Sequence, residues 1–325
     1  CRILLMSTSI YKTTAQVTFF STVEKTLSFI YRIALSRMIG AEGLGIYQIA
    51  LSVFSVLLTA ASSGVPVTVS RLITKQNALG NTAGRSAVVT AGIVSTLIFT
   101  VPAVALIFGG QKIFGLLFSD ERCLEVFLII LPGLILTSVY SVMRGAFWGD
   151  RQFMPYSLIE LAEDALMVGL GCILVAGAAG AADGARRAAV AVFVSYVFSF
   201  AVSLFWYFKK GGRLVNPSKQ LKPLLSSSLP VTAMRTATSL LNSLVAVLMP
   251  FLLVKMCGYT DSEAVSLYGA AAGMAVPILF IPSSLIGSIA VVLAPELSEN
   301  FYRNRTERLK SDVEKSVKSA MLIAF

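Results

Sequence analysis

Long apolar segments separated by short basic stretches make up most of the chain. A helical crossing of a bilayer needs about 20 residues, and each of these segments is long enough. Because irregular backbone that faces lipid leaves polar groups without partners, the pattern predicts helices throughout and an all-α multi-pass membrane protein. The eight complete segments and the start of a ninth lie near residues 13–38, 45–70, 86–110, 123–143, 155–179, 187–208, 224–256, 264–294 and 316 onward.

Composition agrees with this prediction. The chain is 56% hydrophobic and only 14% charged, with a mean hydropathy of +0.78, whereas soluble domains carry about 25% charged residues. The net charge of +10 lies mainly in the short connections, which is typical of cytoplasmic loops and does not indicate a nucleic-acid partner. Eighteen of the 27 Lys and Arg residues fall on the side of the N-terminus and six on the opposite side. We therefore expect a plasma (inner) membrane protein whose N-terminus is cytoplasmic.

Several kinds of chemistry are unsupported by the sequence. It contains no histidine, and its four cysteines lie far apart without a Cys-x-x-Cys spacing, so we predict no metal site, no cofactor and no disulfide framework. The connections are too short to hold a soluble catalytic domain. The sequence therefore predicts a protein that is not an enzyme.

The first apolar segment contains an unusual number of charges, namely Glu24, Lys25, Arg32 and Arg37. A charge at the centre of a membrane helix costs about 2.5–3.5 kcal/mol, so such residues usually face a polar path or one another. Lys25 and Arg32 are seven residues apart and share one helix face, which makes them candidates for a phosphate path. Glu24 is a candidate for the polar cavity of the same path. In the alternative interpretation, Arg37 extends to the interface and Glu24 pairs with Lys25.

The seventh segment offers further polar side chains for such a path. Arg235 and Asn242 are also seven residues apart and lie on one helix face. We predict that Arg235 extends the phosphate path and that Asn242 contacts the polar part of the substrate. Alternatively, Arg235 anchors the cytoplasmic end of its helix near Pro230.

The fifth segment contains three acidic residues on one face. Glu160, Glu163 and Asp164 follow the spacing i, i+3, i+4. Carboxylates in a membrane cavity can bind H⁺ or Na⁺, so these residues are candidates for ion coupling. The alternative is that they pair with Arg144 or Arg151 near the cytoplasmic surface.

Two segments contain residues that interrupt helices. The second holds Gly64 and Pro66, and the eighth holds Pro277 and Pro282. Proline removes a helical hydrogen bond, and broken helices let transporter halves move against each other. These four residues are candidate hinges, although glycine and proline in membrane helices often serve packing alone.

A weak internal repeat indicates how the chain is organised. Residues 42–50 align with residues 263–271, because the glutamate, tyrosine and alanine positions coincide at an offset of 221. The repeat predicts two lobes of the same topology: a first lobe over 1–210 with six segments, a basic cytoplasmic linker over 211–223, and the start of a second lobe over 224–325. The chain begins without Met and ends inside an apolar run, so we expect a longer protein with a truncated second lobe.

Residues 29–47 and 64–71 resemble the opening of the stage V sporulation protein B and polysaccharide biosynthesis exporter family, and 148–155 and 294–298 resemble later parts of it. This family belongs to the multidrug/oligosaccharidyl-lipid/polysaccharide (MOP) superfamily, which includes the lipid II flippases. The resemblance implies a two-lobe MOP/MATE-like bundle around a central cavity. It also implies that the protein translocates lipid-linked oligosaccharide or peptidoglycan precursors across the bacterial plasma membrane by alternating access. In the lipid II flippases, cationic residues of the first segment face the cavity, which here implies Lys25 and Arg32.

The expected partners are a polyprenyl-pyrophosphate-linked saccharide, the lipid bilayer and H⁺ or Na⁺. The alternative within the superfamily is cation-coupled efflux of small cationic drugs, which calls for an acidic, aromatic cavity instead of one lined by Lys25, Arg32 and Arg235. A lipid-processing enzyme would need an acidic metal motif or a sizeable polar domain, and a membrane scaffold would need no transport residues.

Overall fold

The computed structural model describes residues 2–116, 118, 120–276 and seven single positions between 307 and 321. Every regular element in these residues is a helix, so the predicted all-α architecture is confirmed. Residues 277–294 of the predicted eighth segment, including Pro277 and Pro282, lie outside the described residues, as does most of the predicted ninth segment.

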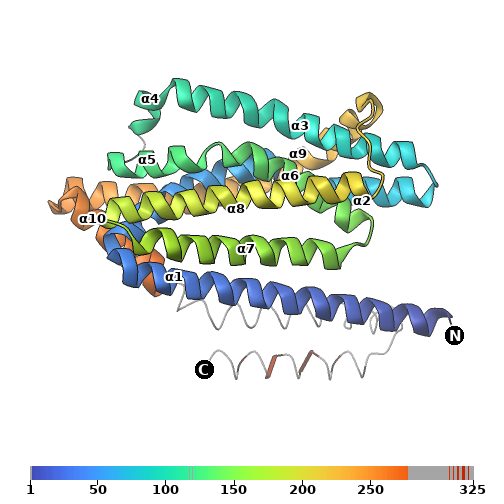
Figure 1. Ribbon diagram of the computed structural model, residues 1–325, viewed down its shortest axis with the longest axis horizontal. Helices are drawn as coiled ribbons and strands as arrows, with labels where there is room; N and C mark the ends of the chain where they lie inside the picture. Colours follow the sequence, from blue (N-terminus) through green and yellow to red (C-terminus); the bar gives the residue numbers. More distant parts are fainter. Residues whose placement is uncertain are drawn as a thin grey trace.

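The long helices run roughly side by side along the long axis of the molecule (Figure 1). Within the described residues, four helical stretches are long and apolar enough to cross a membrane, and a bent pair of helices adds a fifth. The four are Phe19–Ala78, Thr82–Gly109, Ala181–Lys209 and Ser218–Cys257, and the pair is Glu121–Ile130 with Gly133–Gly149. The elements in order are α1 (Arg2–Ser62), α2 (Val65–Ala78), α3 (Thr82–Gly109), α4 (Gln111–Gly115), α5 (Glu121–Ile130), α6 (Gly133–Gly149), α7 (Phe153–Ala176), α8 (Ala181–Lys209), α9 (Ser218–Cys257), α10 (Asp261–Tyr268) and the π-helical η1 (Gly269–Ala275).

The predicted first and second segments are joined without a loop. Helix α1 covers the first segment and the second as far as Ser62, and within it only Gly40 has a non-helical conformation, with φ 69° and ψ −176°. Glycine adopts such a positive φ readily because it has no Cβ. The N-terminus and α2 lie at the same end of the bundle (Figure 1), so the chain turns back at Gly40.

The interruption predicted in the second segment is present between α1 and α2. Pro66 lies in the first turn of α2, where a missing N–H removes no helical hydrogen bond. The backbone N–H of Gly64 donates to Thr232 Oγ1 of α9 over 3.1 Å. A side chain on Gly64 would collide with the carbonyl of Ser228. The break therefore packs closely against α9.

The predicted fourth segment is bent rather than straight. It consists of α5 and α6, which meet at an angle of 44°. Pro132 lies between them, and a proline ring clashes with the carbonyl four residues earlier. After the bend, α6 continues to Gly149, beyond the predicted end at residue 143. Arg144 is therefore inside a helix and not in a cytoplasmic loop.

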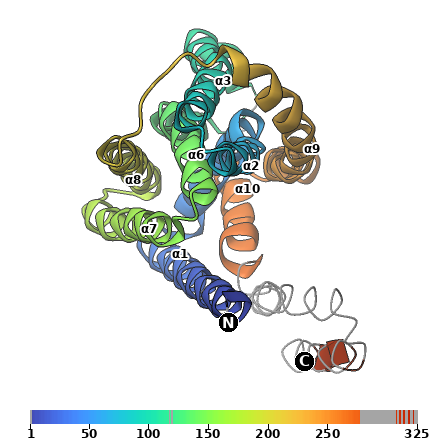
Figure 2. The ribbon, with the colours of Figure 1, turned by 90° about the vertical axis from the view of Figure 1, so that its right-hand side faces the viewer.

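Helix α6 lies in the middle of the bundle when it is viewed along its axis, between α2, α3, α7 and α8 (Figure 2). It approaches α2 closely at Gly145, which has no side chain. A Cβ at this position would lie 2.6 Å from the carbonyl oxygen of Pro66. Buried residues of α2, α3 and α6, including Val69, Val88 and Met143, form one hydrophobic core, and α1, α5 and α8 form a second. The centre of the bundle is thus well packed around α6.

The two halves of the sequence repeat contact each other in the structure. Gly45 packs against the carbonyl of Val265, and Gly269 packs against the carbonyl of Ala41. Such contacts require glycine because a Cβ would overlap backbone atoms. Residues 42–50 and 263–271 therefore cross at close range, at the end of the bundle opposite the N-terminus (Figure 1).

A polar network links three helices at this same end. Arg122 of α5 contacts Glu42 Oε1 over 2.7 Å and Asp120 Oδ2 over 2.6 Å. Ser262 of α10 donates to Glu42 Oε1 over 2.5 Å. The carboxylate of Glu42 thus joins the turn of α1 to both α5 and α10.

Candidate functional site

A cavity of about 270 Å³ lies between α1, α6, α7 and α8. A water molecule takes about 30 Å³ in the liquid, so the cavity can hold a small ion with several waters. It is too small for a lipid-linked saccharide. The residues that line it are Glu24, Leu58, Ser62, Thr137, Tyr140, Ser141, Arg144, Glu160, Glu163, Asp164 and Tyr196.

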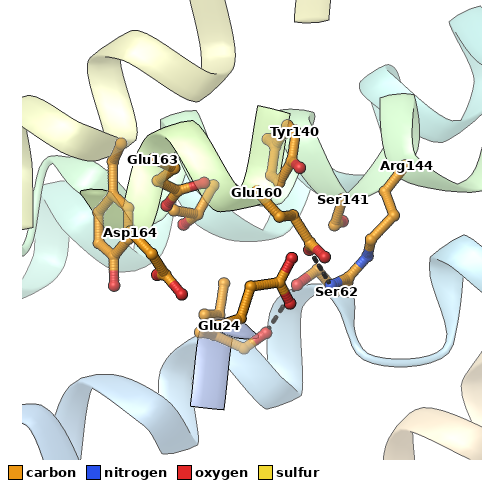
Figure 3. A pocket seen from close by; sticks show the side chains of 11 residues that line it. Glu24, Ser62, Tyr140, Ser141, Arg144, Glu160, Glu163 and Asp164 are labelled. Atoms are coloured by element: carbon orange, nitrogen blue, oxygen red, sulfur yellow. Dashed lines mark hydrogen bonds and ion pairs between the residues drawn. The ribbon is translucent and has the colours of Figure 1, made fainter. Parts of the chain in front are cut away.

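Four carboxyl groups meet at this cavity (Figure 3). Glu160, Glu163 and Asp164 come from α7, as expected for one helix face, and Glu24 comes from α1. The sequence had grouped Glu24 with Asn242, whereas the structure places it opposite the acidic face of α7. Within the described parts of the chain, no group of carboxylates lies close enough together to hold a metal ion by itself.

Arg144 supplies the positive charge that faces these carboxyl groups. Its Nη1 lies 3.5 Å from Glu160 Oε1, and its Cζ lies 5.5 Å from the ring centroid of Trp148. Its Nε is buried without a hydrogen-bond partner among the described residues. If all four carboxyl groups ionise, one guanidinium faces four negative charges. Because buried unpaired charge is costly, protons or cations must neutralise the excess.

Hydroxyl groups complete the lining of the cavity. The Tyr140 side chain is only 6% exposed, and its OH lacks a hydrogen-bond partner in the described part of the chain. Ser62 and Ser141 donate their hydroxyl protons to backbone carbonyls of their own helices, over 2.9 Å and 2.7 Å. Their oxygen lone pairs remain available as acceptors for a cation.

Lys25 and Arg32 lie outside the acidic cavity. Both side chains are exposed on α1, and neither forms an ion pair with a residue that the structure describes. Arg37, which was interpreted as an interfacial residue, is exposed as well. The structure therefore separates the acidic cavity from the predicted phosphate path, although neighbouring residues of α1 contribute to each.

Arg235 lies at the break between α1 and α2. Its Nη1 donates to the carbonyl oxygen of Ser63 over 3.2 Å. Asn242 is exposed farther along α9. Neither residue lines the acidic cavity, so the roles assigned to them in substrate contact remain predictions, as does the hinge role of Gly64 and Pro66.

Tyr140 and Arg144 are the main cavity residues that the sequence analysis did not select. They are four residues apart on one face of α6. The signal was hidden because the apolar run was taken to end at residue 143, which placed Arg144 in a loop. Its contact with Glu160 matches the alternative considered for the acidic face. Arg151 lies beyond the end of α6 and is exposed.

This bundle of apolar helices with a charged interior has the fold of a multi-pass membrane transporter. It matches a solved structure described as the inward-facing conformation of a multidrug resistance MATE family transporter of the MOP superfamily, with a TM-score of 0.69. That match covers 96% of this chain and 71% of the transporter at 17% identity. A MOP superfamily transporter from Pyrococcus furiosus Vc1 (DSM3638) matches with a TM-score of 0.64 and 17% identity, over 96% of this chain and 70% of that one. The predicted MOP/MATE-like fold is confirmed.

The chain belongs to the polysaccharide biosynthesis protein family, whose sequence profile matches residues 10–301. Stage V sporulation protein B of Bacillus subtilis (strain 168) is 25% identical over 317 residues, which are 92% of this chain and 60% of that protein. Lipid II flippase MurJ of the same organism is 24% identical over 174 residues, which are 50% of this chain and 32% of that protein. The predicted family is confirmed, and the chain spans about 60% of the length of the sporulation protein.

Proposed function

We propose that the full-length protein translocates a lipid-linked saccharide across the bacterial plasma membrane and that cation binding drives the transport. One observation carries this proposal. Helix α1 directs Glu24 into an acidic cavity, while Lys25 and Arg32 lie exposed outside it, without ion-pair partners in the described part of the chain. A movement of α1 would therefore affect a cation site and an anion site together.

On the substrate side, the pyrophosphate of a polyprenyl-linked saccharide needs a replacement for its hydration shell. Ammonium and guanidinium groups provide strong charge-assisted hydrogen bonds to phosphate oxygens. Lys25 and Arg32 are accessible for this role, and Arg235 is exposed on α9. The polyprenyl tail would stay in lipid. The names of the sporulation protein and the lipid II flippase support this class of substrate.

On the cation side, Glu24, Glu160, Glu163 and Asp164 would exchange H⁺ or Na⁺ with one side of the membrane at a time. Transport follows from alternating access between a first lobe over 1–210 and a second lobe after the linker at 211–223. The N-terminus and the linker would be cytoplasmic, in agreement with the distribution of basic residues.

The break at Gly64 and Pro66 is the proposed hinge. Its backbone makes hydrogen bonds with Thr232 and Arg235 of α9, which belongs to the proposed second lobe. A change in the position of α9 would therefore bend or straighten the path from α1 to α2.

A second function is cation-coupled efflux of small cationic molecules. It is favoured by the acidic cavity, which is also lined by Tyr140 and Tyr196. The likeness of the fold to a multidrug resistance transporter points the same way. In this case the substrate would compete with the coupling cation for the carboxyl groups, and Lys25 and Arg32 would have no direct role.

The test uses the full-length protein in proteoliposomes and a fluorescent polyprenyl-pyrophosphate-linked saccharide. We expect Lys25→Gln and Arg32→Gln each to lower the initial translocation rate at least tenfold, since each removes one charge from the phosphate path. Arg37→Gln is the matched control and should remain within twofold of wild type. Translocation that neither substitution changes would contradict the phosphate path. Transport of a cationic dye without transport of the saccharide would favour efflux.

A further inference from the structure

We propose that Arg144 is a tethered counter-cation of the acidic cavity and competes with the coupling cation for Glu160. The inference rests on the cation step of the proposed function. It assigns to Arg144 the task of weakening cation binding enough for the cation to leave again.

The contact between Arg144 and Glu160 is loose compared with other ion pairs in the structure. It is a single contact of 3.5 Å, whereas charge-assisted hydrogen bonds are usually about 2.7–2.9 Å long. Arg122 reaches Asp120 with both Nε and Nη2, at 3.0 Å or less. Arg85 reaches Asp150 in the same two-pronged way. The Arg122 pair lies at the start of α5 and the Arg85 pair joins α3 to the end of α6. Both have two-pronged geometry, whereas the single, longer contact of Arg144 leaves room for exchange.

The guanidinium of Arg144 is also incompletely satisfied. Its Nε is buried without a partner in the described part of the protein, although a guanidinium offers five N–H donors. The ring of Trp148, one helical turn further on, lies 5.5 Å from its Cζ, within the range of cation–π attraction. Arg144 makes this contact at the same time as the one with Glu160, so the guanidinium keeps a favourable neighbour when a cation occupies Glu160.

Tyr140 gives an independent indication of a ligand. Tyr140 lines the cavity beside Glu160 (Figure 3). Only 6% of its surface is exposed, so more than nine-tenths of it is buried. Because a buried hydroxyl without a partner is destabilising, a partner for Tyr140 is expected at this point. A hydrated Na⁺, or a water bound to a protonated carboxyl group, would supply it.

Every helix around the cavity presents titratable groups to Arg144. Changes in protonation therefore involve the whole set and not Glu160 alone. These groups are Glu24 from α1, Tyr140 from α6, Tyr156, Glu160, Glu163 and Asp164 from α7, and Tyr196 from α8.

The exchange gives Glu160 one positive partner at a time. Without a bound cation, Arg144 pairs with Glu160 and offsets one negative charge. When H⁺ or Na⁺ binds at Glu160 and Tyr140, the guanidinium loses its contact with Glu160 and keeps the one with the Trp148 ring. The returning guanidinium then displaces the cation on the other side of the membrane. Removal of Arg144 would leave the cation without a competitor, and the cation would bind more tightly.

The experiment measures cation binding by the purified full-length protein in the absence of saccharide. One arm follows ²²Na⁺ binding at fixed pH, and the other follows proton uptake in weakly buffered, Na⁺-free solution. We expect Arg144→Gln to tighten binding at least tenfold in the arm that corresponds to the coupling ion. Arg144→Lys, which keeps the charge, should tighten it less. Arg151→Gln removes an exposed charge beyond the end of α6 and should change it less than twofold.

Tyr140→Phe provides a second variant if Arg144→Gln does not fold, because it removes only one buried oxygen. We expect it to weaken cation binding several-fold. Unchanged or weaker binding by Arg144→Gln, or unchanged binding by Tyr140→Phe, would overturn the role assigned to the pair. Absence of Na⁺ and proton binding in wild type would contradict the cation step of the proposed function as well.

Discussion

The hydrogen bond between Gly64 and Thr232 joins the helix break to α9, and its removal tests whether this contact contributes to stability. The backbone N–H of Gly64 has Thr232 Oγ1 as its acceptor, over 3.1 Å, and Gly64 is buried. Thr232→Val keeps the shape of the side chain but replaces the hydroxyl with a methyl group. The N–H then faces an apolar atom.

The expected cost follows from the lost acceptor. A buried donor without a partner costs about 1–3 kcal/mol. With an unfolding entropy of about 2.1 cal/mol/K per residue, that corresponds to a decrease in Tm of about 1.5–4.5 °C for 325 residues and to a smaller decrease for the full-length protein. Thr238→Val is the matched control, because Thr238 lies exposed on the same helix and its hydroxyl bonds to the carbonyl of Met234 in its own helix. We expect the control to change Tm by less than about 1 °C.

The assay is thermal unfolding of the detergent-solubilised full-length protein, followed by intrinsic fluorescence. A larger decrease in Tm for Thr232→Val than for Thr238→Val supports the contact between the break and α9. Equal Tm values for the two variants would refute the reasoning, since they would show that Gly64 finds another acceptor or that the break is not packed against α9.

Three further predictions concern other parts of the chain. Ser262 and the neighbouring Arg122 guanidinium hold the pKa of the Glu42 carboxyl below its ordinary value of 4.5. The contribution of ionised Glu42 to the free energy of unfolding is therefore complete above pH 4.5 and is lost as the pH falls through the lowered pKa. Unfolding measured against pH should show this loss in wild type and not in Glu42→Gln. Gly145→Ala should lower the free energy of unfolding by about 1–3 kcal/mol because of its backbone contact in α2, whereas Gly169→Ala, which has open space around it, should leave it unchanged or raise it by up to about 1 kcal/mol in thermal melts. If the N-terminus and the linker at 211–223 are cytoplasmic, α9 ends on the outer side at the exposed Cys257. A membrane-impermeant maleimide should then label a variant with Cys257 as its single cysteine in intact cells. Labelling only after permeabilisation would contradict the cytoplasmic N-terminus.

The sequence located the helices, the connection near residue 40 and the break at Gly64 and Pro66, but not the backbone geometry at the first of these or the bend at Pro132. The sequence separates the first two segments between residues 38 and 45, but it does not show that the connection is a single positive φ at Gly40 inside one continuous helix. Pro132 bends the α5–α6 pair, although the surrounding residues are as apolar as those of a straight helix. Both features depend on backbone geometry, which the average hydropathy of a segment does not report.

The candidate site was predictable where a single helix determines it. Glu160, Glu163 and Asp164 share one face of α7 by spacing alone, and the structure directs all three into the cavity. The addition of Glu24 and Arg144 depends on how α1 and α6 pack against α7. The contact of Arg235 with Ser63 likewise joins residues that are far apart in the sequence, so no local pattern could indicate it.

The most direct test of the proposed coupling measures translocation of a labelled polyprenyl-pyrophosphate-linked saccharide by the full-length protein as a proton or Na⁺ gradient is imposed on proteoliposomes. Wild type and Glu24→Gln are compared, because Glu24 is the cavity carboxylate on the helix that also carries Lys25 and Arg32. The account predicts that one of the two gradients accelerates wild-type translocation and that Glu24→Gln loses this response. Wild-type translocation that is indifferent to both gradients, or a Glu24→Gln variant that responds as wild type does, would contradict it.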